Sequence, residues 1–182
     1  MKHTMIILLG GALLTSVAFG ADKTTVSKLY DSQLSMVESE VVSLAEAMPA
    51  EKYNFAPTAG EFKGVRTFAM QVKHLASVIY IAAAAAREEK SPEDPGPGEN
   101  GPDWVKTKDQ IVQYLKGSFA YAHKVMGTLN EGNMLDMVKS PFGGPDVARS
   151  GIASATVWHS FDHYGQMVVY ARMNGVVPPA SR

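Results

Sequence analysis

Residues 158–179, WHSFDHYGQMVVYARMNGVVPP, are the most informative part of the chain. His159 and His163 are four positions apart, so on an α-helix they lie about 40° apart around the axis, with Cβ atoms roughly 6 Å apart. Two imidazoles at this spacing can bind one metal ion. Asn174 and Gly175 are typical of a left-handed helix end, and the two prolines that follow prevent continuation. The stretch therefore predicts a helix that carries a candidate metal-binding pair.

Both histidines fall on the side of this helix that we expect to face the interior. The helix is predicted to have Ser150 as its N-cap, and the inward stripe also contains Ile152, Ala155, Thr156, Gln166, Met167 and Tyr170. An H-x-x-x-H pair is equally typical of two hydrogen-bonded or partly exposed histidines, so the pair alone leaves both interpretations open. A third ligand from another helix would favour the metal.

Three further segments show the three- and four-residue hydrophobic spacing of amphipathic helices. The first runs from Val26 to Met48 and is closed by Pro49, and the second begins near Thr67 and continues through a run of alanines to Ala86. We expect nearly all apolar residues in these stripes, including most of the ten methionines, to pack in the core.

The third segment begins with a capping box, in which Thr107 and Gln110 each satisfy a backbone N–H group of the other. Its apolar stripe runs to a predicted end near Asn130. The linkers on either side, residues 91–104 (SPEDPGPGENGPDW) and 139–145 (KSPFGGP), are rich in proline and glycine and are predicted to be loops. No segment shows sustained period-two alternation, so a sheet is not expected, and the sequence predicts an all-α four-helix bundle.

A third metal ligand is available from two positions. His74 lies on the second predicted helix in an apolar strip with Met70 and Val78, where a lone histidine is more often a hydrogen-bonded core residue. His123, on the third helix, follows Phe119 by four residues and also has an inward-facing spacing. The residues alone do not choose between the two histidines.

The composition narrows the chemistry further. The chain has 182 residues, enough for one compact domain, and 17 basic against 18 acidic residues give a net charge of -1, which does not favour nucleic-acid binding. It contains no cysteine, which excludes disulfides, cysteine-ligated zinc, iron–sulfur clusters and thiol nucleophiles. No G-x-S-x-G, P-loop or G-x-G-x-x-G motif is present. A metal site is thereby confined to nitrogen and oxygen ligands.

Residues 1–20 have the pattern of a secretory signal peptide: Lys2, an apolar stretch, and a small-x-small end before Ala21. The apolar stretch is shorter than the roughly 20 residues of a membrane-spanning helix, which argues against an uncleaved anchor. Cleavage after Gly20 leaves residues 21–182 and removes one lysine, so 16 basic against 18 acidic residues give a net charge of -2. We therefore expect a periplasmic or secreted protein without stable membrane insertion.

The chain resembles the DinB/YfiT-like family of metal-binding four-helix bundles. The resemblance lies in residues 67–80 (TFAMQVKHLASVIY), in residues 158–179 and in the order of the helices. It implies a divalent ion held by His74, His159 and His163, and so favours His74 over His123. It also implies a helix order that departs from simple up-down-up-down topology and a tendency to form homodimers.

Two hypotheses about function follow. Characterised relatives include metal-dependent thiol S-transferases and a thiol-dependent isomerase, so the resemblance implies thiol chemistry, whereas export makes hydrolysis or simple metal and ligand binding relatively more credible. The first hypothesis is an exported metal-dependent transferase or hydrolase acting on a small molecule, with zinc or nickel as the expected ion. The second is a non-enzymatic bundle that binds a small ligand or a metal.

Few supporting residues can be proposed from the sequence, and none is assigned as catalytic. Gln166 and Asp162 flank the histidine pair and are candidates to orient an imidazole, although a solvated position is the simpler interpretation for Asp162. Glu61, in the loop before the second helix, is a candidate for the mouth of the site. The tyrosines near these segments are expected to pack in the core or at an interface: Tyr80, Tyr164 and Tyr170.

Overall fold

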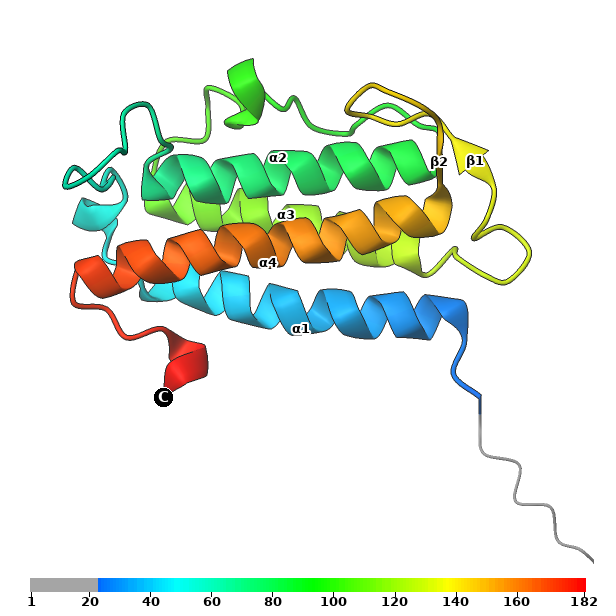
Figure 1. Ribbon diagram of the computed structural model, residues 1–182, viewed down its shortest axis with the longest axis horizontal. Helices are drawn as coiled ribbons and strands as arrows, with labels where there is room; N and C mark the ends of the chain where they lie inside the picture. Colours follow the sequence, from blue (N-terminus) through cyan, green and yellow to red (C-terminus); the bar gives the residue numbers. More distant parts are fainter. Residues whose placement is uncertain (1–22) are drawn as a thin grey trace, which may run out of the picture.

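Four α-helices form a bundle in the computed structural model, which describes residues 23–182 (Figure 1). The helices are α1 (Val26–Ala47), α2 (Phe68–Ala86), α3 (Lys108–Met126) and α4 (Arg149–Met173). Short 3-10 turns lie at Ala50–Lys52, Pro97–Glu99 and Pro179–Ser181. The all-α prediction is confirmed. The predicted signal peptide, residues 1–20, lies outside the described residues.

The first three helices begin as their sequences predict. Thr25, Thr67 and Thr107 each accept a hydrogen bond at their side-chain oxygen from the backbone N–H three residues later, and Gln110 completes the capping box. The third helix ends at Met126, earlier than predicted, because the chain tightens there into a turn with bonds between residues three apart.

The start of α4 differs from the prediction of a Ser150 cap. The helix begins two residues earlier, with Ala148 at the N-cap position, and no side chain in the described part of the chain caps it. Instead the N–H groups of Arg149 and Ser150 donate to the carbonyl oxygens of Asp136 and Met134. The preceding loop therefore satisfies free N–H groups of the first turn, which a cap residue would otherwise satisfy.

A small antiparallel pair of strands, which the sequence did not predict, closes the loop before α4. In it β1 (Met137–Val138) pairs with β2 (Val147–Ala148). Each strand has only two residues, too few to show a period-two pattern, and the fold class is unchanged. The pair fixes the loop of residues 139–146 near the start of α4.

The helix order is not that of a simple up-down bundle. In the bundle α2 packs mainly on α3 and α4, and α1 packs on the same two helices, so α1 lies diagonally across from α2. Lys108, at the start of α3, donates to the carbonyl oxygens of Glu46 and Met48 at the end of α1. Tyr30 and Ser154 place the starts of α1 and α4 side by side. Hence α1 runs antiparallel to α3 and in the same direction as α4.

The direction of α2 determines the path of the loop that follows it. The start of α2 also lies beside the end of α1, since the Ala69 N–H donates to the Tyr53 carbonyl in the connecting segment. Thus α2 and α3 run parallel, and residues 87–107 must return along the whole bundle to join them (Figure 1). This return passes over α2 and brings Glu99 to His74.

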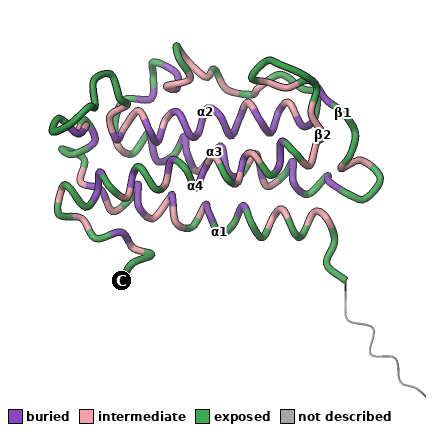
Figure 2. Tube along the Cα trace, in the orientation of Figure 1, coloured by how far each residue is buried: buried purple, intermediate pink, exposed green. Residues whose placement is uncertain are grey.

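The interior of the bundle is centred on α2, whose trace is buried along most of its length (Figure 2). Phe68, Leu75 and Ile79 of this helix are almost inaccessible, as are Phe119 and Met167 from its two neighbours. By length and composition α2 would also pass as a membrane-spanning helix, with a mean hydropathy of 1.3, but 72% of that window is buried inside the bundle. Its apolar character is accounted for by its central position in the core.

Candidate metal centre

Three histidines from two antiparallel helices meet in the middle of the bundle. His74 comes from α2, and His159 and His163 come from successive turns of α4; one ring nitrogen from each lies within 4.8 Å of the others. The ring centroids are 4.5 Å apart for the α4 pair, and 4.8 Å and 5.5 Å from His74 to His163 and His159. His74 and His163 are buried, with 6% and 5% of their surface exposed, and His159 is partly buried. The fold thus places the three predicted residues around one point.

His74 is oriented by the long loop that crosses α2. Its Nδ1 lies 3.2 Å from the backbone carbonyl oxygen of Glu99, and a carbonyl only accepts, so this nitrogen carries the proton. The carboxylate of Glu99 is 3.7 Å from the same nitrogen. The other nitrogen, Nε2, is consequently the unprotonated one that can bind a metal.

A chain of side-chain hydrogen bonds orients His163. Its Nδ1 donates to Gln71 Oε1 at 2.5 Å, Gln71 Nε2 donates to Gln166 Oε1 at 2.9 Å, and Gln166 Nε2 donates to Asp162 Oδ2 at 3.1 Å. The chain ends on a carboxylate, which only accepts when ionised, so the direction of every donor in it is fixed. Nδ1 of His163 is again the protonated nitrogen, and Nε2 again the free one.

Gln166 and Asp162 therefore act differently from the prediction. Neither is hydrogen-bonded to an imidazole of the described residues. Both support Gln71, a buried residue that was not among the predicted site residues. Gln71 precedes His74 by three residues, about one helical turn, so the spacing alone could have indicated that the two side chains lie on the same face of the helix. The partner that makes it informative, His163, lies 92 residues away in the sequence.

His159 has a feature that packing does not explain. Its Nε2 is buried and has no hydrogen-bond partner in the described part of the chain. A buried polar nitrogen without a partner costs about 1–3 kcal/mol, and such groups in native structures have a reason. A metal ion between the three rings would satisfy this nitrogen together with Nε2 of His74 and of His163, so the residues present fit a divalent ion.

The surroundings keep the three imidazoles neutral, which is the form that binds metals. Burial, with the positive charge of Arg66 and the neighbouring His159, lowers the pKa of His74 to about 4. Burial and the other two histidines lower the pKa of His163 to about 3, and burial also lowers the pKa of His159. Protons therefore do not compete for these nitrogens at neutral pH.

The loop that holds Glu99 has an unusual backbone. Glu99 has a φ of 57°, which is uncommon for a residue with a side chain. Gly96 has a φ of 68°, and a Cβ there would collide with the carbonyl oxygen of Gly101, so the loop closes tightly on itself. Arg66 binds the loop through Gly98 and Asn100. These contacts hold the Glu99 carbonyl over His74. The sequence does not distinguish Glu99 from the other acidic residues of the loop, so this role could not be predicted from it.

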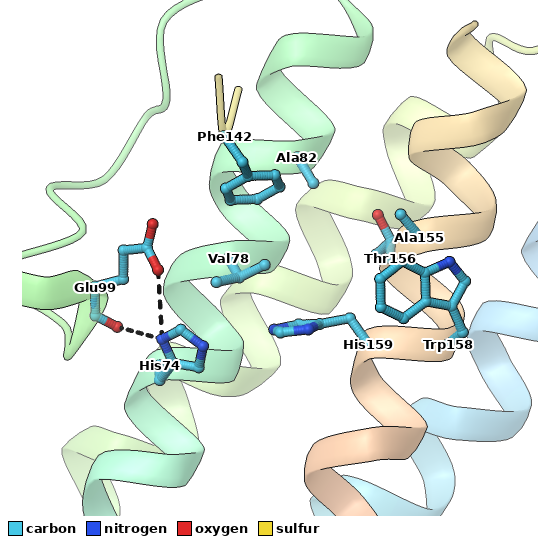
Figure 3. Close-up of a pocket in the computed structure, with 9 residues that line it drawn as sticks. All are labelled: His74, Val78, Ala82, Glu99, Phe142, Ala155, Thr156, Trp158 and His159. Carbon is cyan, nitrogen blue, oxygen red and sulfur yellow. Dashed lines mark hydrogen bonds and ion pairs between the residues drawn. The ribbon is translucent and has the colours of Figure 1, made fainter. Parts of the chain in front are cut away.

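A cavity of about 290 Å³ opens beside the histidines (Figure 3). His74, His159 and Glu99 form its polar end, and it continues between α2 and α4 towards Phe142. His163 lies behind this cavity and does not line it. A ligand in the cavity would therefore approach the histidine cluster from the His74 and His159 side.

The other residues considered from the sequence lie elsewhere. Glu61 is exposed and does not line the cavity beside the histidines. Tyr80 and Tyr170 are buried in the core and Tyr164 packs against it, as predicted. His123 is absent from the cluster: it lies on the opposite side of the core, hydrogen-bonded to two carboxylates of α1.

Comparisons with known proteins support the family that the histidine pattern suggested. A DinB superfamily model matches residues 33–167. The structure is similar to a DinB-like protein from Bacillus cereus with a TM-score of 0.68 at 15% identity, covering 85% of this chain and 96% of that one. It is also similar to a DinB-like protein from Bacillus subtilis with a TM-score of 0.62 at 17% identity, covering 81% and 92%.

A third structural relative, a conserved protein from Enterococcus faecalis, has a TM-score of 0.62 at 16% identity, with 82% of this chain and 97% of that one covered. At these identities the structural likeness concerns the fold alone. No sequence among the curated proteins matches the chain. Because the family model covers well over half of its length, the chain belongs to the DinB superfamily.

Proposed function

We propose that this protein is a divalent-metal-dependent enzyme of the transferase or hydrolase type, with zinc or nickel held by His74, His159 and His163. The observation that carries the proposal is the meeting of one ring nitrogen from each histidine within 4.8 Å, beside a cavity that His74 and His159 line. Structural zinc sites are usually closed by four protein ligands, whereas three histidines leave a position open for water or substrate. This arrangement is typical of a catalytic metal.

When bound, such an ion supplies Lewis acidity, which lowers the pKa of a bound water or thiol towards neutrality and produces a nucleophile. The chain's own residues orient the ligands and the substrate around it. The contacts of Glu99 and Gln71 orient two of the imidazoles towards a common point.

Glu99 is positioned to take part in proton transfer. It is the only carboxylate among the residues that line the cavity, and its side chain lies at the polar end, near His74 (Figure 3). We assign to it the acceptance of a proton from the nucleophile, because its carboxylate lies at the end of the cavity where two of the candidate metal ligands lie. The Thr156 hydroxyl, by contrast, donates to the Ile152 carbonyl within its own helix.

The test starts from protein purified without added metal or chelator. Elemental analysis is expected to find about one divalent ion per chain, and thiol-transfer, ester and amide substrates are expected to reveal turnover that chelation abolishes and metal restores. His159→Ala should lose both metal and turnover. Absence of stoichiometric metal, with no effect of His159→Ala on binding or activity, would overturn the proposal.

A non-enzymatic ligand-binding bundle is the second candidate. It is favoured by the cavity lining, which apart from the histidines, Glu99 and the internally bonded Thr156 is apolar. Metal-dependent binding of a small ligand, without turnover of any substrate in the panel, would support this candidate over the enzyme.

We also propose that the protein acts in the periplasm or outside the cell, after removal of residues 1–20. The support is the sequence pattern of that segment. Cell fractionation followed by N-terminal sequencing tests it: the expected mature N-terminus is Ala21. Recovery of the intact chain in the cytoplasm would contradict export.

A further inference from the structure

An apolar groove continues from the histidine cluster along the line between α2 and α4. The cavity beside the histidines meets a second cavity of about 190 Å³, and both are lined by Ala82, Phe142 and Ala155. The second cavity extends under the loop of residues 139–146 as far as Gly151 at the start of α4. The two cavities together form a passage that leads away from the metal-binding nitrogens.

The two ends of this passage differ in chemistry. The polar groups gather at one end, where His74, His159 and Glu99 lie, and Figure 3 shows Phe142 and Ala82 at the other. Among the described residues, none with a charged side chain lines the second cavity. A ligand that follows the groove therefore meets a metal-binding end first and an uncharged, apolar surface beyond it.

Small side chains keep the groove open. Ala82 of α2 faces Ala155 and Gly151 of α4 across it, and larger residues at these positions would fill the space. Two aromatic side chains at its edge are left in contact with solvent: Phe142 is 54% exposed and Trp158 is 62% exposed. Large exposed apolar groups beside a cavity are typical of a surface that a ligand covers.

We propose that the groove binds the uncharged alkyl or aryl tail of a substrate whose oxygen- or sulfur-containing head binds the metal. The part of this inference that concerns the metal-binding head rests on the proposed function. The part that concerns the apolar tail rests only on the groove. An anionic tail is excluded by chemistry, because no lysine or arginine of the described residues lines either cavity and burial of an unpaired charge is costly.

The head and the tail are tested together with a series of metal-binding hydroxamates on the zinc-loaded protein. Calorimetric affinity is expected to rise about fourfold for each methylene from acetohydroxamate to hexanohydroxamate. A tail of the same length that ends in a carboxylate should lose this gain. Equal affinities along the series would overturn the proposal.

Two variants locate the tail. Ala155→Leu fills the groove and should abolish the dependence on chain length while acetohydroxamate still binds, and Phe142→Ala, in an exposed loop, should weaken the dependence without a risk to folding. Phe62→Ala, an exposed phenylalanine away from the groove, is the matched control and should leave the series unchanged. A chain-length dependence that survives Ala155→Leu and Phe142→Ala would contradict the assignment of the groove.

The groove is tested without metal by the uncharged fluorescent probe N-phenyl-1-naphthylamine. Binding to the metal-free protein that is lost in Ala155→Leu and weakened in Phe142→Ala supports the groove even if elemental analysis finds no metal, in which case only the proposed function fails. Absence of probe binding to the wild-type protein would overturn the groove itself.

Discussion

The bundle contains two histidine environments with opposite electrostatics. His74, His159 and His163 lie between α2 and α4, where burial is the largest cause of their lowered pKa values. His123 on α3 lies between two carboxylates of α1: its Nδ1 is 2.6 Å from Asp31 and its Nε2 is 2.9 Å from Glu38.

The difference shows what makes a histidine available to a metal. Both nitrogens of His123 are engaged with carboxylates. Burial alone would lower the pKa of His123, but the hydrogen bonds and charges of the two acids raise it overall. In the cluster, His74 and His163 instead use Nδ1 for orientation and keep Nε2 free, and Nε2 of His159 has no partner in the described part of the chain. The partners of each ring, more than its burial, therefore separate the candidate ligands from the histidine that holds two helices together.

The largest expected effect comes from removal of a candidate ligand. His159→Ala should reduce bound metal from about one ion per chain to almost none. Loss of a residue that orients a ligand lowers metal affinity roughly 10- to 100-fold, and loss of a direct ligand lowers it further. His123→Ala is the matched control and should retain the metal. Elemental analysis after dialysis measures both, and equal loss of metal in the two variants would remove the distinction between the two environments.

Removal of the orienting partner should have a smaller effect. Gln71→Ala breaks the chain of hydrogen bonds to His163 and is expected to weaken metal binding by about 10- to 100-fold. Competition with a chromophoric chelator measures the affinity. Gln33→Ala, at an exposed position of α1, should leave it unchanged. An unchanged affinity in Gln71→Ala would show that the ring needs no such support.

The metal-free protein should lose stability in acid because of the clustered histidines. The pKa of His74 falls from its ordinary 6.5 to about 4, so between these values the unfolded chain binds a proton that the folded chain does not. The free energy of unfolding is therefore expected to fall as the pH drops from 6.5 to 4, by more than about 1 kcal/mol from His74 alone. Urea unfolding of the wild type and of His74→Gln at pH 6.5 and at pH 4 isolates this contribution. The fall in the free energy of unfolding between the two pH values should be smaller in the variant. An identical pH dependence in both proteins would contradict it.

His123 should show the opposite pH dependence and the smallest effect. A raised pKa means that its contribution is fully present below pH 6.5 and is lost as the pH rises through the folded-state pKa. His123→Ala is expected to lower the free energy of unfolding by about 1 kcal/mol at pH 6, since the carboxylates are partly exposed, and by less at pH 9. Urea unfolding at the two pH values measures the difference. A larger loss at pH 9 would mean that packing, rather than the ion pairs, is what His123 contributes.

Most of the helical architecture could be predicted from local patterns. A helix cap and the hydrophobic spacing of a helix both depend on residues three or four positions apart, which can be seen directly in the sequence. The caps of the first three helices are of this kind: Thr25, Thr67 and Thr107. The start of α4 and the small strand pair were not predicted, because the N–H groups of Arg149 and Ser150 are satisfied by carbonyls of a loop rather than by a side chain.

The site divides in the same way. The sequence by itself determined the spacing of His159 and His163, the absence of cysteine and the candidates for a third ligand, because helical periodicity and composition are local properties. The resemblance to the family favoured His74 over His123, and the tertiary structure brings His74 to the pair. Only the tertiary structure decided that Gln71 and the Glu99 carbonyl orient two of the rings and that an apolar groove adjoins them. These contacts join residues 25 to 92 positions apart, and their distances are set by the packing of α2 against α4 and by the return path of the loop between α2 and α3.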